Sequence, residues 1–231
     1  MRYQQIINSR SKISKIDNIE EINHDYFPEG FKPRILNEHP YIIKLRRFIN
    51  TEEIRALMKL GEDKFERSTI VISGELVEST TRTSETAYIT YDGHFENYEK
   101  PIENILNKVC YLVGCHRSQI ESMMLVKYKK GKYYDEHWDF FKKEHEDIMG
   151  KAKQRMATFF VYLTILDDNE GGENEFPKLN LRIKPSKGAA VFWWNMDPDG
   201  KLLRKTLHQG NPVLGDTIKY GLNIWIRERS F

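Results

Sequence analysis

The second half of the chain alternates short apolar runs with turn signals, and this pattern limits the folds open to it. Turn signals lie at Lys130-Gly131, Gly171-Gly172, Pro185-Ser186 and residues 197–200. Between them, the residues are rich in β-branched and aromatic side chains, which fit pleated and half-buried strands. Four strands are therefore predicted, over residues 123–129, 157–166, 189–194 and 218–227.

Two helices are predicted ahead of these strands. Asn50 with Glu53 three residues later has the spacing of a capping box, and apolar residues follow at helical intervals. A second amphipathic period covers 99–113 and ends at Gly114. Helices followed by many short strands predict an α+β fold, namely a β-barrel or jelly roll with helices on one outer face.

The length of 231 residues suits one large domain. Residues 1–38 are polar and show no period, so we expect an N-terminal extension that is draped over the domain or partly disordered. The domain itself is then expected over 39–231. Within it, 67–91 is β-rich, and the polar stretch 78–85 is a candidate mobile loop.

Charge and cysteine content exclude several classes of protein. The 36 Lys and Arg residues nearly balance 34 Asp and Glu residues, so nothing indicates a nucleic acid partner. Cys110 and Cys115 are too few for a secreted disulfide framework and are interpreted as buried or incidental thiols. The polar N-terminus lacks a signal peptide, and no window spans a membrane. We therefore expect a soluble, intracellular protein without a membrane partner, whose oligomeric state the sequence leaves open.

A candidate metal site lies in the segment 133–140. On an extended chain the side chains of His137 and Asp139 point to the same side, as two ligands of one ion must. His208, just before the last predicted strand, is the candidate third ligand. Two histidines and one carboxylate leave coordination positions open and suit iron(II), whereas no Cys/His set closes a structural zinc shell. By itself, a His-x-Asp triplet in a chain with seven histidines is more often incidental.

Lys219 lies within an apolar, aromatic strand segment, residues 218–225. Composition alone favours an exposed strand residue. If the lysine is instead buried, it requires an anion, because burying an unpaired charge is costly. The distal carboxylate of 2-oxoglutarate would be such an anion, and Tyr128 and Tyr162 are candidate hydroxyl donors to it.

These residues are part of a longer pattern. From about residue 41 to 231, the chain resembles the prolyl 4-hydroxylase family of iron(II)/2-oxoglutarate dioxygenases. The matching stretches are Tyr134-x-x-His137-x-Asp139-Phe140, Gly171-Gly172-Glu173 with Phe176-Pro177, Pro185-x-Lys187-Gly188 up to Trp193, His208, and Lys219-Tyr220 with Trp225. Two positions depart from the family: Asn174 stands where many members have Thr, and Arg227 where peptide-binding members often have His.

The resemblance implies a double-stranded β-helix, that is, a jelly roll with N-terminal helices packed on the major sheet. It implies catalytic roles for the iron ligands and Lys219. The implied binding residues are His137, Asp139 and His208 for iron, Lys219 with Tyr128, Tyr162 or Thr158 for 2-oxoglutarate, and Tyr134, Arg155, Trp225 and Arg82 for the peptide. Arg82 would belong to a loop that closes over the substrate.

The implied reaction is C4 hydroxylation of a peptidyl proline with O₂ and 2-oxoglutarate, giving succinate and CO₂, with ascorbate as reductant. The carboxylate of Asp139 favours hydroxylation over halogenation, which needs that ligand position vacant. One alternative is an oxygenase acting on another peptide residue or a nucleobase, although Lys219 and Trp225 stand where base-repair enzymes have arginines. The other is a non-catalytic jelly-roll binding module. The aromatic residues Phe159, Phe160, Phe192 and Trp193 are expected in the core.

Overall fold

The computed structural model describes residues 27–72, 75–78, 80–89, 100–143 and 149–231. Its centre is an eight-stranded antiparallel sheet, here called the major sheet, in the order β1-β2-β12-β9-β14-β7-β6-β3. In that order its strands are Lys32–Glu38, Tyr41–Arg46, Ala190–Trp194, Arg155–Tyr162, Lys219–Arg227, Met123–Tyr128, Glu85–Ile89 and Glu66–Arg67.

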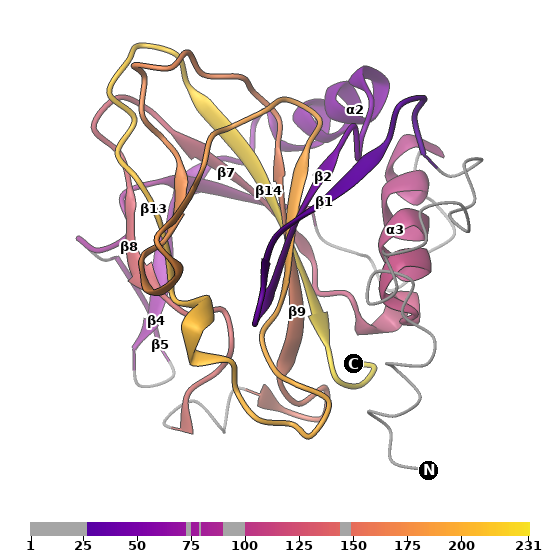
Figure 1. The fold of residues 1–231 in the computed structure, drawn as a ribbon. Coiled ribbons are helices and arrows are strands. Elements are labelled where there is room, and N and C mark those ends of the chain that lie inside the picture. The colour runs from indigo at the N-terminus through magenta and orange to yellow at the C-terminus, as the bar shows by residue number, and fades with distance from the viewer. Residues whose placement is uncertain (1–26, 73–74, 79, 90–99, 144–148) are drawn as a thin grey trace.

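A four-stranded antiparallel sheet, the minor sheet, has the order β11-β10-β13-β8. Its strands are Leu181–Ile183, Asn174–Phe176, His208–Gly210 and Tyr134–His137, and a separate hairpin pairs β4 (Thr69–Ile72) with β5 (Glu75–Glu78). Short 3-10 helices are η5 (Arg117–Gln119), η7 (Pro177–Leu179) and η8 (Arg204–Thr206). Figure 1 shows β8 and β13 on one side of the major sheet and the helices α2 and α3 on the other. The β-rich jelly-roll class predicted from the sequence is confirmed.

The two predicted helices are present as α2 (Thr51–Gly61) and α3 (Lys100–Val113). The capping box is confirmed, since Asn50 Oδ1 accepts from the Glu53 amide at 2.9 Å and Glu53 Oε2 accepts from the Asn50 amide at 2.8 Å. Glu53 also accepts from Lys108 Nζ of α3 at 2.5 Å, and both side chains are buried. One residue thus caps the first helix and joins it to the second.

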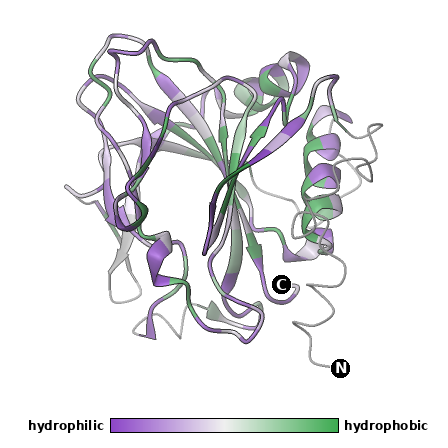
Figure 2. Ribbon diagram, viewed as in Figure 1, coloured by the Kyte–Doolittle hydropathy of each residue, from purple (hydrophilic) through white to green (hydrophobic). Residues whose placement is uncertain are grey.

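Two apolar clusters stabilise this arrangement. The first joins α2 and α3 to the major sheet through residues such as Leu57, Leu106 and Phe159, and Figure 2 shows α3 with one hydrophobic and one hydrophilic side. The second cluster contains side chains of both sheets, among them Phe176 and Trp193. Burial of this area from water is the main force holding the layers together. As predicted, the four aromatic residues 159, 160, 192 and 193 are buried.

The four predicted strands are β7, β12, β14 and β9, and only β9 differs noticeably in its bounds. It begins at Arg155 and ends at Tyr162 rather than covering 157–166. The strand stops there because the Leu163 amide bonds to the Tyr220 carbonyl and Thr164 Oγ1 accepts from the Tyr220 amide, which ends the regular ladder.

The structure differs from the domain boundary predicted after residue 38. Residues 32–38 form β1 at the edge of the major sheet, paired with β2 so that Glu38 lies opposite Tyr41. The aromatic rings of Phe27 and Phe31 stack with centroids 4.0 Å apart and are buried in the helix–sheet core. The domain therefore begins no later than residue 27, and the rest of the predicted extension, 1–26, lies outside the described residues. Among the described helices, none is long and apolar enough to cross a membrane.

Candidate active site

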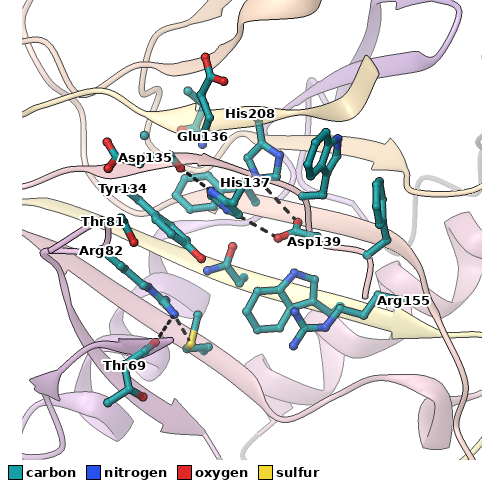
Figure 3. Close-up of a pocket in the computed structure, with 18 of the residues that line it drawn as sticks. Thr69, Thr81, Arg82, Tyr134, Asp135, Glu136, His137, Asp139, Arg155 and His208 are labelled. Carbon is teal, nitrogen blue, oxygen red and sulfur yellow. Dashed lines mark hydrogen bonds and ion pairs between the residues drawn. The ribbon is translucent and has the colours of Figure 1, made fainter. Parts of the chain in front are cut away.

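Three predicted metal ligands meet between the sheets. His137 ends β8 and His208 begins β13, and the two residues are paired directly across these strands. Asp139 follows His137 by two positions, and its Oδ1 and Oδ2 lie 3.8 Å from His137 Nε2 and His208 Nε2 respectively. The three candidate ligand atoms all lie within 4.8 Å of one another, and Figure 3 shows the three side chains pointing toward one another. Cross-strand pairing of the two histidines, with Asp139 two residues after the end of β8, therefore brings the predicted triad together.

Each ligand is oriented by a second contact. The Nδ1 atoms of His137 and His208 lie 2.8 Å and 2.9 Å from the backbone carbonyls of Asp135 and Thr206. Because a carbonyl only accepts, each Nδ1 carries the hydrogen, and each Nε2 presents its lone pair to the site. The third ligand, Asp139, accepts through Oδ2 from Thr158 Oγ1 at 2.8 Å.

The charges of the triad also suit a cation. Burial and the neighbouring His208 lower the pKa of His137 to about 3, so this imidazole is neutral at physiological pH. Burial alone would raise the pKa of Asp139, but the two histidines, Arg155 and the Thr158 hydroxyl together lower it. A neutral nitrogen and an ionised carboxylate are the donor states that iron(II) binds. The residues present therefore fit iron.

Lys219, at the start of β14, is 1% exposed, so the exposed-strand alternative is excluded. Its Nζ lies 3.2 Å from Asn174 Oδ1 and 5.2 Å from the ring centroids of Tyr128 and Phe160. Burial lowers the pKa of Lys219 to about 7, and the charge of Glu173 only partly offsets this effect. In the described part of the chain no carboxylate forms an ion pair with it, so the lysine is suited to receive an anion.

Of the three other residues predicted to bind 2-oxoglutarate, only Tyr128 lies beside Lys219 in the cavity. Tyr128 lies directly opposite Lys219 across the β7–β14 pair, lines the cavity, and stays a neutral donor because burial raises its pKa. Tyr162 does not line the cavity, and its hydroxyl donates to the Ile183 carbonyl at 3.3 Å. Thr158 donates to Asp139, a predicted metal ligand, and also accepts from Asn195. The structure thus brings one of these three residues to Lys219.

The triad and Lys219 share one cavity of about 490 Å³. Its other walls hold the four residues predicted to bind the peptide, which form two cation–aromatic pairs. The Arg155 guanidinium lies 3.8 Å from the ring centroid of Trp225, and the Arg82 guanidinium lies 4.9 Å from that of Tyr134. Tyr134 in turn stacks on His137, with centroids 3.6 Å apart. Figure 3 shows Arg82 and Arg155 on different sides of the triad.

Arg82, which was predicted on a mobile loop that closes over the substrate, is part of the cavity wall in the described structure. Its side chain is largely buried, with the residue 7% exposed, and its backbone forms an isolated β-bridge with Tyr134. Its Nη1 donates to the Thr69 carbonyl at 3.3 Å. Among the described residues, two buried side-chain polar atoms have no hydrogen-bond partner, namely Arg82 Nε and Trp225 Nε1. Both are donors, and both residues line this cavity. An unpaired buried donor is costly, so an incoming acceptor would be stabilised here.

Sequence reasoning missed three polar residues of the site. Glu121 accepts two bonds from Arg155, both 2.7 Å. Asn195 donates to Thr158, and Asn174 accepts from Lys219. Glu121 and Asn195 belong to no motif, whereas the departure at position 174 was a signal whose partner only the structure identifies.

Comparisons with known proteins agree with this geometry. Residues 123–227 match the model of the 2OG-Fe(II) oxygenase superfamily. Prolyl 4-hydroxylase subunit alpha-1 of Gallus gallus is 30% identical over 197 residues, which are 83% of this chain and 36% of that protein. Prolyl 4-hydroxylase 1 of Arabidopsis thaliana is 29% identical, over 86% of this chain and 73% of that protein. The chain thus spans about a third of the length of the alpha-1 subunits it matches.

Solved structures of prolyl hydroxylases are also similar to this chain. The viral collagen prolyl hydroxylase of Paramecium Bursaria Chlorella virus-1, in its 2OG complex, has a TM-score of 0.63 and 28% identity, over 83% of this chain and 98% of that one. A Pseudomonas putida prolyl-4-hydroxylase has a TM-score of 0.54 at 16% identity, over 93% and 97% of the two chains, and supports the fold alone. The chain is therefore similar to prolyl 4-hydroxylases over most of its length and, over residues 123–227, to the 2OG-Fe(II) oxygenase superfamily.

Proposed function

We propose that the protein is an iron(II)- and 2-oxoglutarate-dependent oxygenase that hydroxylates proline in a peptide or protein. One observation carries the proposal: a facial set of two histidines and a carboxylate shares a cavity with a buried lysine that forms no ion pair with any of the described residues. The first feature suits a metal with open coordination positions, and the second suits the carboxylate of a co-substrate.

The residues have distinct tasks in this reaction. His137, Asp139 and His208 would hold iron(II), with Thr158 keeping the carboxylate in place. Lys219 would bind the distal carboxylate of 2-oxoglutarate. When bound, iron and 2-oxoglutarate use O₂ to insert one oxygen atom into a C–H bond and the other into succinate, with release of CO₂. Ascorbate belongs to the proposal as the reductant that keeps the iron in its iron(II) state.

The cavity wall supports proline as the target. Arg82 Nε and Trp225 Nε1 have no hydrogen-bond partner in the described part of the chain, so these donors fit a substrate that offers acceptors. A peptidyl proline has no backbone N–H, and an extended polyproline II segment leaves its carbonyls without internal partners. The names of similar proteins agree, since one is a viral collagen prolyl hydroxylase, and a structure at 16% identity holds a hypoxia inducible factor peptide.

The alternatives are weaker. A non-catalytic binding module has no need of a complete ligand set with neutral and ionised donors in place. A nucleobase oxygenase is disfavoured by the near balance of charge, and no nucleic acid partner is proposed. An oxygenase acting on another peptide residue remains the second candidate, and the peptide panel below distinguishes it.

The test begins without oxygen. Iron(II) and then 2-oxoglutarate are added, and the metal-to-ligand charge-transfer band in the visible is recorded. We expect a band in the unaltered protein, none in His137→Ala, and a weakened one in Lys219→Ala. Oxygen is then admitted with proline-rich peptides, with matched peptides in which alanine replaces proline, and with an alkylated oligonucleotide. Succinate and a mass gain of one oxygen only with the proline peptides support the proposal, while no band and no retained iron would refute it.

A further inference from the structure

Arg227, at the end of β14, is buried and does not line the cavity. A register shift between Ile226 and Arg227 interrupts the regular ladder there, and such irregularities redirect a side chain. The guanidinium contacts two separate parts of the chain. Its Nε donates to the Lys153 carbonyl at 2.9 Å, its Nη1 donates to Glu121 Oε1 at 3.1 Å, and its Nη2 donates to the carbonyls of Met149 and Lys153.

The contact with Glu121 connects Arg227 to the cavity wall, because Glu121 lines the cavity. The Glu121 carboxylate accepts from Arg155 Nε and Nη2, both at 2.7 Å, and is shared with Arg227. The Glu121 amide bonds to the Trp225 carbonyl at 2.9 Å. Bonds between ionised partners are stronger than neutral ones and fix the planar guanidinium group in orientation. Glu121 therefore transmits the position of Arg227 to the Arg155–Trp225 pair.

The contact with the turn 149–153 leads to the cavity by a second route. Lys153 has φ +62°, a left-handed conformation that a lysine adopts only when its surroundings hold it. Its carbonyl accepts from two nitrogens of Arg227. The next residue, Gln154, holds the backbone of Phe141 on both sides, through Oε1 at 2.6 Å and Nε2 at 2.9 Å. The ring centroid of Phe141 lies 4.9 Å from the guanidinium carbons of both Arg155 and Arg227.

We propose that Arg227 is a positioning residue that fixes Arg155 and Phe141 in the cavity wall, through Glu121 and the turn 149–153. The part that concerns substrate rests on the proposed function. A histidine at this position, with two ring nitrogens, could not hold the carboxylate and both carbonyls together. The departure from the family at this position is thus an internal brace of the peptide-binding wall, not a contact with the peptide.

The brace is tested first in the protein without peptide, by hydrogen exchange. Arg227→Gln removes the charge, and Arg229→Gln, an exposed arginine two positions further along, is the matched control. We expect Arg227→Gln to speed exchange at least tenfold at the amides of Glu121, Phe141 and Gln154, with β9 and β12 unchanged. The control should leave all of them unchanged. Unchanged exchange at these three amides, or an equal rise throughout the core, would overturn the proposal. If Arg227→Gln does not fold, Arg227→Lys, which keeps the charge without the planar fork, replaces it.

The second measurement uses turnover of the best proline peptide. Arg227→Gln should raise the peptide KM about tenfold and leave kcat and the dissociation constant of 2-oxoglutarate, read from the charge-transfer band, within twofold. Adding the change to a Glu121→Gln protein should raise KM by no more than twofold again, because both act through one network. A normal peptide KM in folded Arg227→Gln would refute the positioning role. If the unaltered protein oxidises no peptide, the proposed function fails, and the exchange result alone decides the brace.

Discussion

Replacing Lys219 by methionine should stabilise the unliganded protein at pH 7 and destabilise it, or leave it unchanged, at pH 10. Burial lowers the pKa of Lys219 from 10.5 to about 7. The unfolded chain therefore binds a proton more readily than the folded one across this pH window. Since each pKa unit corresponds to about 1.4 kcal/mol, the lysine costs the folded state about 4 kcal/mol at pH 7 and about 1 kcal/mol at pH 10.

Methionine keeps the apolar stem and removes the charge. It also leaves Asn174 Oδ1 without the donor that lies 3.2 Å away, which costs about 1–3 kcal/mol at any pH. The net gain in the free energy of unfolding is then about 1–3 kcal/mol at pH 7. The effect of the substitution on the free energy of unfolding should differ by about 3 kcal/mol between pH 7 and pH 10. This difference is the more robust quantity, because the cost of the lost hydrogen bond is the same at both pH values and cancels.

Urea denaturation of both proteins, without iron or 2-oxoglutarate, measures this difference directly. The pH effects of all other groups cancel between the two proteins, so the comparison isolates position 219. The same lysine predicts proton uptake on binding 2-oxoglutarate, because the carboxylate raises the pKa again. At pH 8, calorimetry in buffers of different ionisation enthalpy should give about 0.9 proton per co-substrate, and none in Lys219→Arg. A stability difference that is the same at pH 7 and pH 10 would refute the reasoning.

Three further predictions concern other parts of the molecule. Thr158→Val removes the hydroxyl that orients the ligand carboxylate and should weaken iron binding about 10–100-fold, measured by anaerobic titration. Gly221→Ala places a Cβ 2.4 Å from Phe160 Cζ and should lower the free energy of unfolding by about 1–3 kcal/mol, with recovery in a Phe160→Leu background. Lys108→Met leaves the buried carboxylate of Glu53 unpaired and should cost about 3–5 kcal/mol in urea denaturation, while a double change with Glu53→Gln should cost less.

The parts of the fold that were predictable are those encoded locally. The capping box at Asn50 involves backbone and side chains three residues apart, and long runs of β-branched and aromatic residues between turn signals favour strands. Strand β1 was missed because Gly30 and Pro33 are signals of turns. Proline is tolerated in that strand because β1 lies at the edge of the major sheet, where one side of the ladder is unpaired.

In the site too, what neighbouring residues determine could be predicted from the sequence, whereas what depends on strand pairing could not. The period of two predicted that His137 and Asp139 face the same way, whereas the placement of His208 opposite His137 depends on strand pairing. The family resemblance implied Tyr162 or Thr158 at the co-substrate, and both residues lie on β9. They are four residues apart, which is about 13 Å along a strand, so they cannot serve the same contact. The sequence predicts on which face of a strand a side chain lies, but only the register of strand pairing determines which part of the cavity that side chain reaches.

Strand β14 illustrates how this register organises the cavity. Lys219, Asn223 and Trp225 alternate along one face of the strand and line the cavity. Gly221 also falls on this face, and the ring of Phe160 occupies the space that a side chain there would need. Lys219 and Trp225 are six residues apart, about 20 Å along the strand, and the two histidines of the triad lie on the minor sheet. The proposed co-substrate anchor, Lys219, and the indole of Trp225, which is proposed to face the peptide, therefore lie near opposite ends of one strand. A change of register in β14 would move both side chains relative to the triad, and the one irregularity in its pairing with β9 lies beyond both of them, between Ile226 and Arg227.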